Sequence, residues 1–349
     1  MAPEVDPSAN AVDGRKQQPW EQLDELGEYR ELCRSRLEHL VPVREPLVLC
    51  SQIQRSGGTL LSRLFDGHPE CHAHPYELKL GKKQPEWPQI DLADSSKRWF
   101  KRLYEEKVGR HLVGGYTKPG LKTADVEVFP FIFLPRLQKL VFDRCAAEWP
   151  IERVRDVFDC YFTSYFNAWL DNQNLYSGSK RVVTAFTPRT NLDPDSVERF
   201  FEAYPDGTLV TLVRDPCAWY GSAVRHRRQY EDIERALELW RQSAAAGIAA
   251  HGRYGERVVV LTYEQLVLEP EVTMQLLAGR LGISWSPTLL EPTFNGRPVR
   301  PNSSDAVSEY GVVGSRAEAW REVLDAEAIA RIASVAGDLY ERAAACSRG

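Results

Sequence analysis

The chain has 349 residues, 43% hydrophobic and 27% charged, so it can bury a full core, and one large α/β domain fits better than two. Its net charge of −5 argues against nucleic acid as the main partner. No apolar run approaches eighteen residues and the polar first nineteen residues are no signal peptide, so we expect no membrane insertion. Seven cysteines without C-x-x-C spacing favour reduced, buried thiols and a cytoplasmic location.

The first 42 residues are predicted to lie outside the main domain. Residues 1–19 are polar and typical of a disordered tail. An amphipathic helix is expected over residues 20–40, ended by Pro42, with an apolar stripe of Leu23, Leu26, Cys33, Leu37 and Leu40. The remainder, 43–349, is predicted to be a single α/β domain.

The first segment that carries chemistry covers residues 47–61. A short apolar run of strand length is followed by Arg55, Ser56, Gly57, Gly58 and Thr59, and a helical pattern covers 58–66. The glycines let the backbone approach an anion, and the hydroxyls, the arginine and the helix N-terminus attract one. Because the segment lacks the lysine of a Walker A loop and has no G-x-G-x-x-G, it predicts an anion site of another type.

Residues 79–180 show no obvious strand and are predicted to form a helical insertion on the substrate side. This region holds an apolar run at 129–134 and a helical run with Phe158, Phe162, Tyr165, Phe166 and Trp169. These aromatic residues form either helix-packing core or the wall of an acceptor pocket, and the sequence leaves both open. The α/β alternation resumes with a strand over 181–185 and a helix over 194–203.

A second strand end repeats the chemistry of the first. The apolar run 208–213 ends in Arg214, Asp215 and Pro216, and Ser222 follows eight residues after Arg214. In an open α/β sheet, ligands bind at the carboxyl ends of strands, where helix N-termini offer N–H groups to anions. Two strand ends that each carry an arginine and a hydroxyl predict a ligand with two separate phosphates. A helix over 318–344 is expected to close the domain.

Together these segments resemble the soluble, bacterial-type sulfotransferases that use 3′-phosphoadenosine-5′-phosphosulfate (PAPS). That family carries [KR]SG[TS]T after one strand and R[DN]-x6-S after another, and here RSGGT stands at 55–59 and Arg214-Asp215 precedes Ser222. Weaker matches are DGHP at 66–69, VLTYEQL at 260–266 and GSR at 314–316, so the resemblance spans roughly residues 46–340. It implies a P-loop-like central parallel sheet flanked by helices, with PAPS as sulfuryl donor and no metal required.

The resemblance also implies roles for particular residues. Nucleotide binding falls to Arg55, Ser56, Gly57, Gly58, Thr59, Leu60, Arg214, Ser222, Tyr263, Ser315 and Arg316. Arg55 is also a catalytic candidate, because a cation beside the leaving phosphate stabilises its developing charge. Glu77, expected on the loop after the first helix, is the candidate general base, and His111 is the alternative. His68, His72 and His74 could form a metal cluster, but His68 falls in the family's His-Pro turn, so no metal site is predicted.

Two departures from the family pattern bear on the chemistry. Gly58 stands where many relatives have threonine or serine, and Phe186 stands where many have a lysine that touches the sulfuryl group. The sequence leaves open whether Arg189 replaces this lysine.

The predicted function is therefore sulfuryl transfer from PAPS to a hydroxyl of a small molecule of specialised metabolism. A carbohydrate or lipid head group is the alternative acceptor. A catalytically inactive nucleotide-binding protein is the alternative of another class, and a P-loop kinase would differ by its need for Mg²⁺ and ATP. The acceptor, O- against N-sulfation and a homodimeric state stay open.

Overall fold

The computed structural model describes residues 25–81, 86–106, 108–115, 131–226, 230–300, 310–314 and 317–347. The chain divides into two compact units, Met1–Leu40 and Val41–Gly349. In the first unit, helix α2 spans Glu25–Glu38, inside the helix expected over residues 20–40. The domain boundary at residue 42 stays a prediction.

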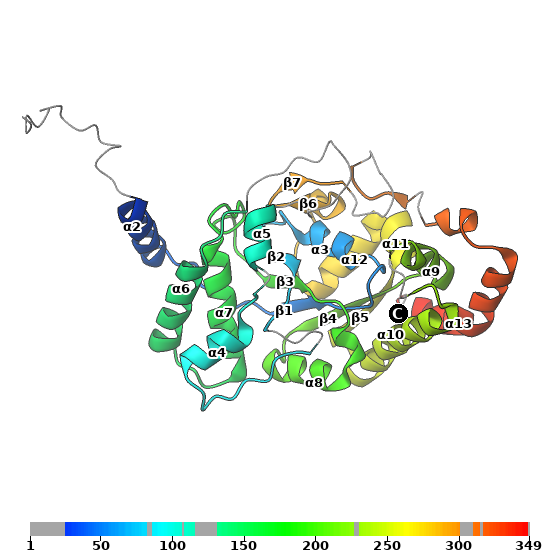
Figure 1. Ribbon diagram of the computed structural model, residues 1–349, viewed down its shortest axis with the longest axis horizontal. Coiled ribbons are helices and arrows are strands. Elements are labelled where there is room, and N and C mark those ends of the chain that lie inside the picture. Colours follow the sequence, from blue (N-terminus) through cyan, green and yellow to red (C-terminus); the bar gives the residue numbers. More distant parts are fainter. Residues whose placement is uncertain are drawn as a thin grey trace, which may run out of the picture. The chain divides into compact units, whose positions relative to one another are not determined.

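A five-stranded parallel sheet forms the centre of the second unit (Figure 1). Its strand order is β2-β3-β1-β4-β5, with bounds β1 Leu47–Cys50, β2 Cys71–Glu77, β3 Val182–Phe186, β4 Thr208–Val213 and β5 Val258–Thr262. β1, β3 and β5 are buried along their whole length, as expected when helices cover both faces of a parallel sheet. The structure thus confirms the predicted fold class, a central parallel sheet flanked by helices.

β2 is an edge strand that the sequence does not predict. Its residues, CHAHPYE, include two histidines and a proline and lack the apolar run of the other strands. An edge strand tolerates proline because the missing N–H can face away from its one neighbour. The expectation that Glu77 lies on a loop is therefore wrong, because Glu77 is the last residue of this strand.

Helices pack on both faces of the sheet (Figure 1). On one face, α3 (Gly58–Phe65), α11 (Tyr263–Leu268) and α12 (Pro270–Leu281) contribute to a core with β1, β4 and β5. On the other face, the core is built by α9 (Pro216–Val224), α10 (Ile233–Tyr254) and α13 (Ala326–Cys346). α8 (Pro194–Ala203) connects β3 to β4, as expected from the sequence.

In the described part of the chain between β2 and β3 there are four helices: α4 Ser96–Leu103, α5 Val108–Gly114, α6 Pro135–Glu148 and α7 Val154–Ala168. Every residue of α7 from Val157 onwards is buried, so its aromatic side chains face core on all sides. This favours the helix-packing interpretation for Phe158, Phe162, Tyr165 and Phe166. The apolar run at 129–134 is described from Phe131 onwards, and Phe131 and Phe133 are also buried.

The end of the chain differs from the single helix expected over 318–344. A 3₁₀ turn at Ala319–Glu322 comes first, and α13 begins only at Ala326. The Asp325 side chain accepts a hydrogen bond from the Ala328 N–H at 2.8 Å and so starts the helix at this point. Shorter elements are 3₁₀ turns at Thr190–Leu192, Gly255–Arg257 and Pro287–Leu290 and the antiparallel pair β6 Thr293–Phe294 and β7 Arg297–Pro298. Among the described residues, no helix has the length and apolar character needed to cross a membrane.

Candidate active site

The loop between β1 and α3 turns sharply in front of the helix N-terminus. Arg55 and Gly57 both adopt left-handed backbone, with φ of 71° and 95°. A Cβ at position 57 would lie 2.5 Å from the Tyr263 ring, so both conformation and space require glycine there. The N-cap residue of α3 is Gly57, which has no side chain to bond the first N–H groups of the helix. These backbone N–H groups therefore point into the loop and can receive an anion.

Side chains from the second strand end hold this loop in place. The Arg214 guanidinium donates to the Arg55 carbonyl at 3.0 Å, and Arg55 Nε donates to Ser222 Oγ at 3.1 Å. The Trp219 indole N–H donates to the Gln54 carbonyl at 2.8 Å. The structure thus brings together Arg55, Arg214 and Ser222, which the sequence separates by up to 167 positions.

Arg214 is suited to hold a phosphate. Its guanidinium lies 4.4 Å from the centre of the Tyr263 ring, and its Nε is buried with no hydrogen-bond partner among the described residues. Burial lowers the pKa of this guanidinium, and the nearby Tyr263, Glu264 and Asp215 only partly oppose that shift. An anion with several acceptor oxygens would complete its hydrogen bonds, so the residues present fit a phosphate here. Tyr263 packs between this cation and Gly57.

A set of residues that the sequence does not single out positions Arg214. The Asp215 N–H donates to both oxygens of Glu264 at 3.1 Å, and the Tyr340 hydroxyl donates to Glu264 at 2.8 Å. Burial raises the pKa of Glu264. The Trp240 indole donates to the Arg214 carbonyl at 2.9 Å. Glu264 neighbours Tyr263 in the chain, but nothing near Trp240 or Tyr340 in the sequence indicates this role.

Phe186 lies against the first residue of α3. A Cβ at Gly58 would fall 2.4 Å from the Phe186 ring and 1.9 Å from the Gln52 side-chain nitrogen. A threonine or serine at position 58 would therefore clash with both side chains, so the two departures from the family pattern are sterically linked.

Arg189 also adjoins the loop. Its Nε donates to the Gln54 side chain at 2.7 Å, and its backbone is left-handed with φ of 72°. The guanidinium therefore lies beside the residue that precedes Arg55.

Glu77 and Phe186 are partners in the β2–β3 ladder, so Glu77 lies at the same carboxyl edge of the sheet as the loop. The Glu77 carboxylate is half-buried and pairs with Lys79 at 2.7 Å. Lys79 is a cation at this edge that the sequence does not single out.

His111 of α5 reaches the same end of β2. Its ring stacks on Tyr76, with centroids 3.4 Å apart, and Tyr76 also contacts Phe131 and Phe294. Burial lowers the pKa of His111 to about 4, so its ring is neutral at pH 7. Its Nδ1 is buried without a hydrogen-bond partner in the described parts of the chain. Both candidate bases thus lie at the end of β2.

Glu105 is a buried anchor beneath these residues. Its carboxylate accepts from the His74 ring at 3.1 Å, the Tyr161 hydroxyl at 2.8 Å and the Lys79 N–H at 2.8 Å. The His74 pair and these donors lower the pKa of Glu105 despite its burial. The network ties the end of β2 to α7.

The three histidines near β2 do not share a centre. His68 contacts the Ser284 carbonyl at 3.0 Å, whereas His74 contacts Glu105. Within the described ranges, no group of three or more histidine, cysteine or acidic side chains could hold a metal ion. Ser315 and Arg316, predicted to bind nucleotide, lie outside the described residues.

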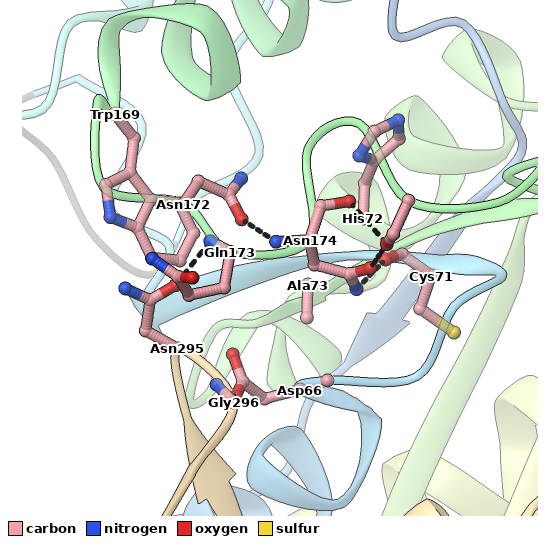
Figure 2. A pocket seen from close by; sticks show the side chains of 12 residues that line it. Asp66, Cys71, His72, Ala73, Trp169, Asn172, Gln173, Asn174, Asn295 and Gly296 are labelled. Carbon is pink, nitrogen blue, oxygen red and sulfur yellow. Dashed lines mark hydrogen bonds between the residues drawn. The ribbon is translucent and has the colours of Figure 1, made fainter.

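A cavity of about 160 Å³ lies near the start of β2, and Figure 2 shows side chains that line it. Its lining includes Asp66, Trp169, Asn174 and Asn295, and it contains none of the predicted site residues. Its polar groups bind one another: the Gln173 N–H donates to the Asn295 side chain at 2.9 Å, and the Asn174 amide donates to the Cys71 carbonyl at 3.0 Å. The predicted site residues therefore lie at the other end of the strands, their carboxyl ends.

Known proteins are similar to this chain in fold and in sequence family. The sulfotransferase domain of the olefin synthase from Synechococcus PCC 7002 aligns with a TM-score of 0.53 and 19% identity, over 87% of this chain and 96% of that one. A sulfotransferase domain from the curacin biosynthetic pathway aligns at 0.48 and 18% identity, over 84% and 98%. No curated protein matches the chain. The model of the sulfotransferase family matches residues 46–287, more than half of the sequence. This chain therefore belongs to the sulfotransferase family.

Proposed function

We propose that this protein transfers a sulfuryl group from PAPS to a hydroxyl of a small-molecule acceptor. The observation that carries the proposal is the direct link between two strand ends: Arg55 donates to Ser222, and Arg214 donates to the Arg55 carbonyl. Each end carries a cation and a hydroxyl, which suits a nucleotide with separate 3′- and 5′-phosphates.

The donor's 5′ end would lie at the N-terminus of α3. The backbone of residues 56–59 and the hydroxyls of Ser56 and Thr59 supply donors there, with Leu60 in the first helical turn. Arg214 and Ser222 would hold the 3′-phosphate. Tyr263 keeps the Arg214 guanidinium in place by stacking, and Ser315 and Arg316 are proposed as further contacts by family resemblance.

In-line transfer breaks the bond between the sulfur and the bridging phosphate oxygen while the acceptor oxygen bonds to sulfur. Negative charge grows on the bridging oxygen, and a preorganised cation with nearby N–H groups stabilises it. Arg55 is fixed for this role by its hydrogen bond to Ser222.

The acceptor hydroxyl must lose its proton to a base as the new bond forms. Glu77 is the proposed base, because it is half-buried at the carboxyl edge of the sheet. His111 is the alternative, since its ring is neutral at pH 7 and its Nδ1 has no hydrogen-bond partner among the described residues.

The aromatic group at the end of β2 is the proposed acceptor wall. Tyr76, His111, Phe131 and Phe294 contact one another there, and apolar and aromatic side chains are typical of small-molecule sites. A specialised metabolite fits this wall better than a sugar, because the cluster offers few polar side chains. The free, mostly buried thiols support a reducing, cytoplasmic location.

A second candidate, a nucleotide-binding protein without transfer activity, is favoured by one observation. Phe186 places an apolar ring against Gly58, at the start of the helix that would face the reacting group.

Calorimetry and a transfer assay separate these candidates. Adenosine 3′,5′-bisphosphate (PAP) should bind without metal and at least tenfold more tightly than AMP, because Arg214 and Ser222 add charge-assisted hydrogen bonds to the 3′-phosphate. Mass-spectrometric screening of candidate acceptors with PAPS should then reveal a product about 80 mass units heavier than the acceptor, because the transfer adds the mass of SO₃. Equal affinity for AMP, or a strict need for Mg²⁺, would refute the donor assignment, whereas binding without any product would favour the inactive protein.

A further inference from the structure

Gln52 stands out because a polar side chain is completely buried there without a partner. Its exposed fraction is 0%, and neither its amide nitrogen nor its amide oxygen has a hydrogen-bond partner among the described residues. A buried amide that gives up water without a replacement destabilises the folded protein. Such a residue therefore calls for an explanation.

The place of this amide in the site supplies one. Gln52 follows β1 by two residues, and its side chain reaches across the loop to the first residue of α3. The amide nitrogen lies 1.9 Å from the point where a Cβ of residue 58 would stand. The amide thus fills the space that any side chain at position 58 would enter, at the helix end where the 5′ anion is proposed to bind.

We propose that the Gln52 amide is a contact for the 5′-phosphosulfate of the donor, with its NH₂ group donating to an anionic oxygen. This inference rests on the proposed function, and it deepens that function by adding a residue that neither the motif nor the family resemblance indicates. Gln52 supplies a neutral donor where position 58 has no hydroxyl and position 186 has no cation.

The surroundings favour an anion over another neutral group. The loop that Gln52 opens also carries Arg55, and the Arg189 guanidinium donates to the Gln54 side chain of the same loop at 2.7 Å. The amide therefore lies in a loop flanked by two arginines. Phe186 is 5% exposed, and its ring shares the space over Gly58 with the amide.

The test exploits opposite effects on stability and on binding. Gln52→Leu keeps most of the side-chain volume and removes both polar atoms. Replacing an unpaired buried amide with an apolar group is neutral or stabilising, so the Tm of the ligand-free variant should equal or exceed that of the wild type. PAPS affinity, measured by calorimetry without acceptor, should fall about tenfold, the loss of one hydrogen bond to a charged group. Gln52→Glu should weaken binding further, because it places a carboxylate beside the anion.

PAP and PAPS as separate probes locate the contact. If affinity falls for both, the amide binds the 5′-phosphate, and if it falls for PAPS alone, the amide binds the sulfuryl group; either supports the proposal. Gln138→Leu is the matched control, since Gln138 is a buried glutamine of α6 outside this site, and it should bind both nucleotides like the wild type. Unchanged binding of both probes by Gln52→Leu would overturn the inference while leaving the function intact. A wild-type protein that binds neither probe would instead refute the proposed function.

Discussion

Arg55 combines an unfavourable backbone conformation with a precise side-chain contact. Its φ of 71° belongs to the left-handed region, which costs a non-glycine residue about 1 kcal/mol or more. Arginine occupies this position although glycine would relieve the strain, and its Nε donates a hydrogen bond to Ser222. Strain that persists at a site of this kind indicates that the side chain, rather than the backbone, is what the position requires.

Comparing Arg55→Ala with Arg55→Gly separates strain from chemistry. Both variants lose the cation, so sulfuryl transfer should fall by a similar factor, about a hundredfold or more in kcat, with a smaller loss of PAP affinity. The glycine variant should be more stable than the alanine variant by about 1 kcal/mol in denaturant unfolding. Equal proportional losses of PAP affinity and of kcat would instead make Arg55 a ground-state contact.

Glu77→Gln tests the base directly. The substitution keeps the shape of the side chain and removes its basicity, so kcat should fall about a hundredfold while nucleotide affinity hardly changes. His111→Phe is the companion variant, because a phenyl ring preserves the stacking on Tyr76 but accepts no proton. Normal turnover by Glu77→Gln together with a large loss in His111→Phe would transfer the role to the histidine.

At the scale of the elements, Glu105 links β2 to the helical region. Glu105→Leu would leave the His74 ring, the Tyr161 hydroxyl and the Lys79 N–H without their acceptor. We expect it to destabilise the fold by about 3 to 5 kcal/mol, as breaking a buried charged network does. Glu105→Gln keeps an acceptor oxygen and should cost less. Urea unfolding of both variants checks this, and a loss below 1 kcal/mol for Glu105→Leu would mean that the network is not essential.

The elements that the sequence predicts well are those whose local pattern agrees with their surroundings. β4 occupies the expected range because it is a continuous apolar run, and α8 does so because it is an amphipathic helix that begins with a proline. β2 could not be predicted, because its partner strand β3 lies more than a hundred positions further along the chain and because His74 is buried by a contact with Glu105 that the local pattern does not reveal. The break before α13 has a local signal, the N-cap residue Asp325. This signal is easily missed because the helical pattern continues across this position.

The site follows the same division. Motif spacing could indicate that Arg55, Arg214 and Ser222 belong together, because those residues contribute to two recognisable strand ends. It could not indicate Glu264, Trp240 or Tyr340, whose hydrogen bonds are made by tertiary packing, or Gln52, whose complete burial depends on the fold.

At the scale of the whole molecule, buried histidines make stability depend on pH. Burial lowers the pKa of His72 to about 3 and that of His111 to about 4, from 6.5. Below pH 6.5 the unfolded chain therefore binds more protons than the folded one. The contribution of these two histidines to the free energy of unfolding is complete above pH 6.5 and is lost as pH falls towards 4 and 3. Asp159 acts in the opposite direction, because burial raises its pKa to about 7.

Variants isolate the histidine contribution from that of Asp159. His72→Leu cannot take up a proton and should lose less stability than the wild type between pH 7 and pH 4.5, as measured by urea unfolding at each pH. Asp159→Asn is the control for the group that acts in the opposite direction, and it should lose more stability than the wild type over the same pH range. Parallel pH profiles for the wild type and His72→Leu would show that His72 titrates normally.

The register of β1 has a consequence for how this chain is made. Its two neighbours, β3 and β4, lie about 135 and 160 residues further along the sequence, and the loop that β1 positions takes its support from residues later still. The central strand therefore emerges from the ribosome long before anything can pair with it. Until β4 has been synthesised, the apolar strand β1 has unpaired backbone groups in a partly folded chain. Exposed strands of this kind are prone to aggregate and to bind chaperones. We therefore expect the yield of folded protein to depend on how fast residues 50–210 are synthesised.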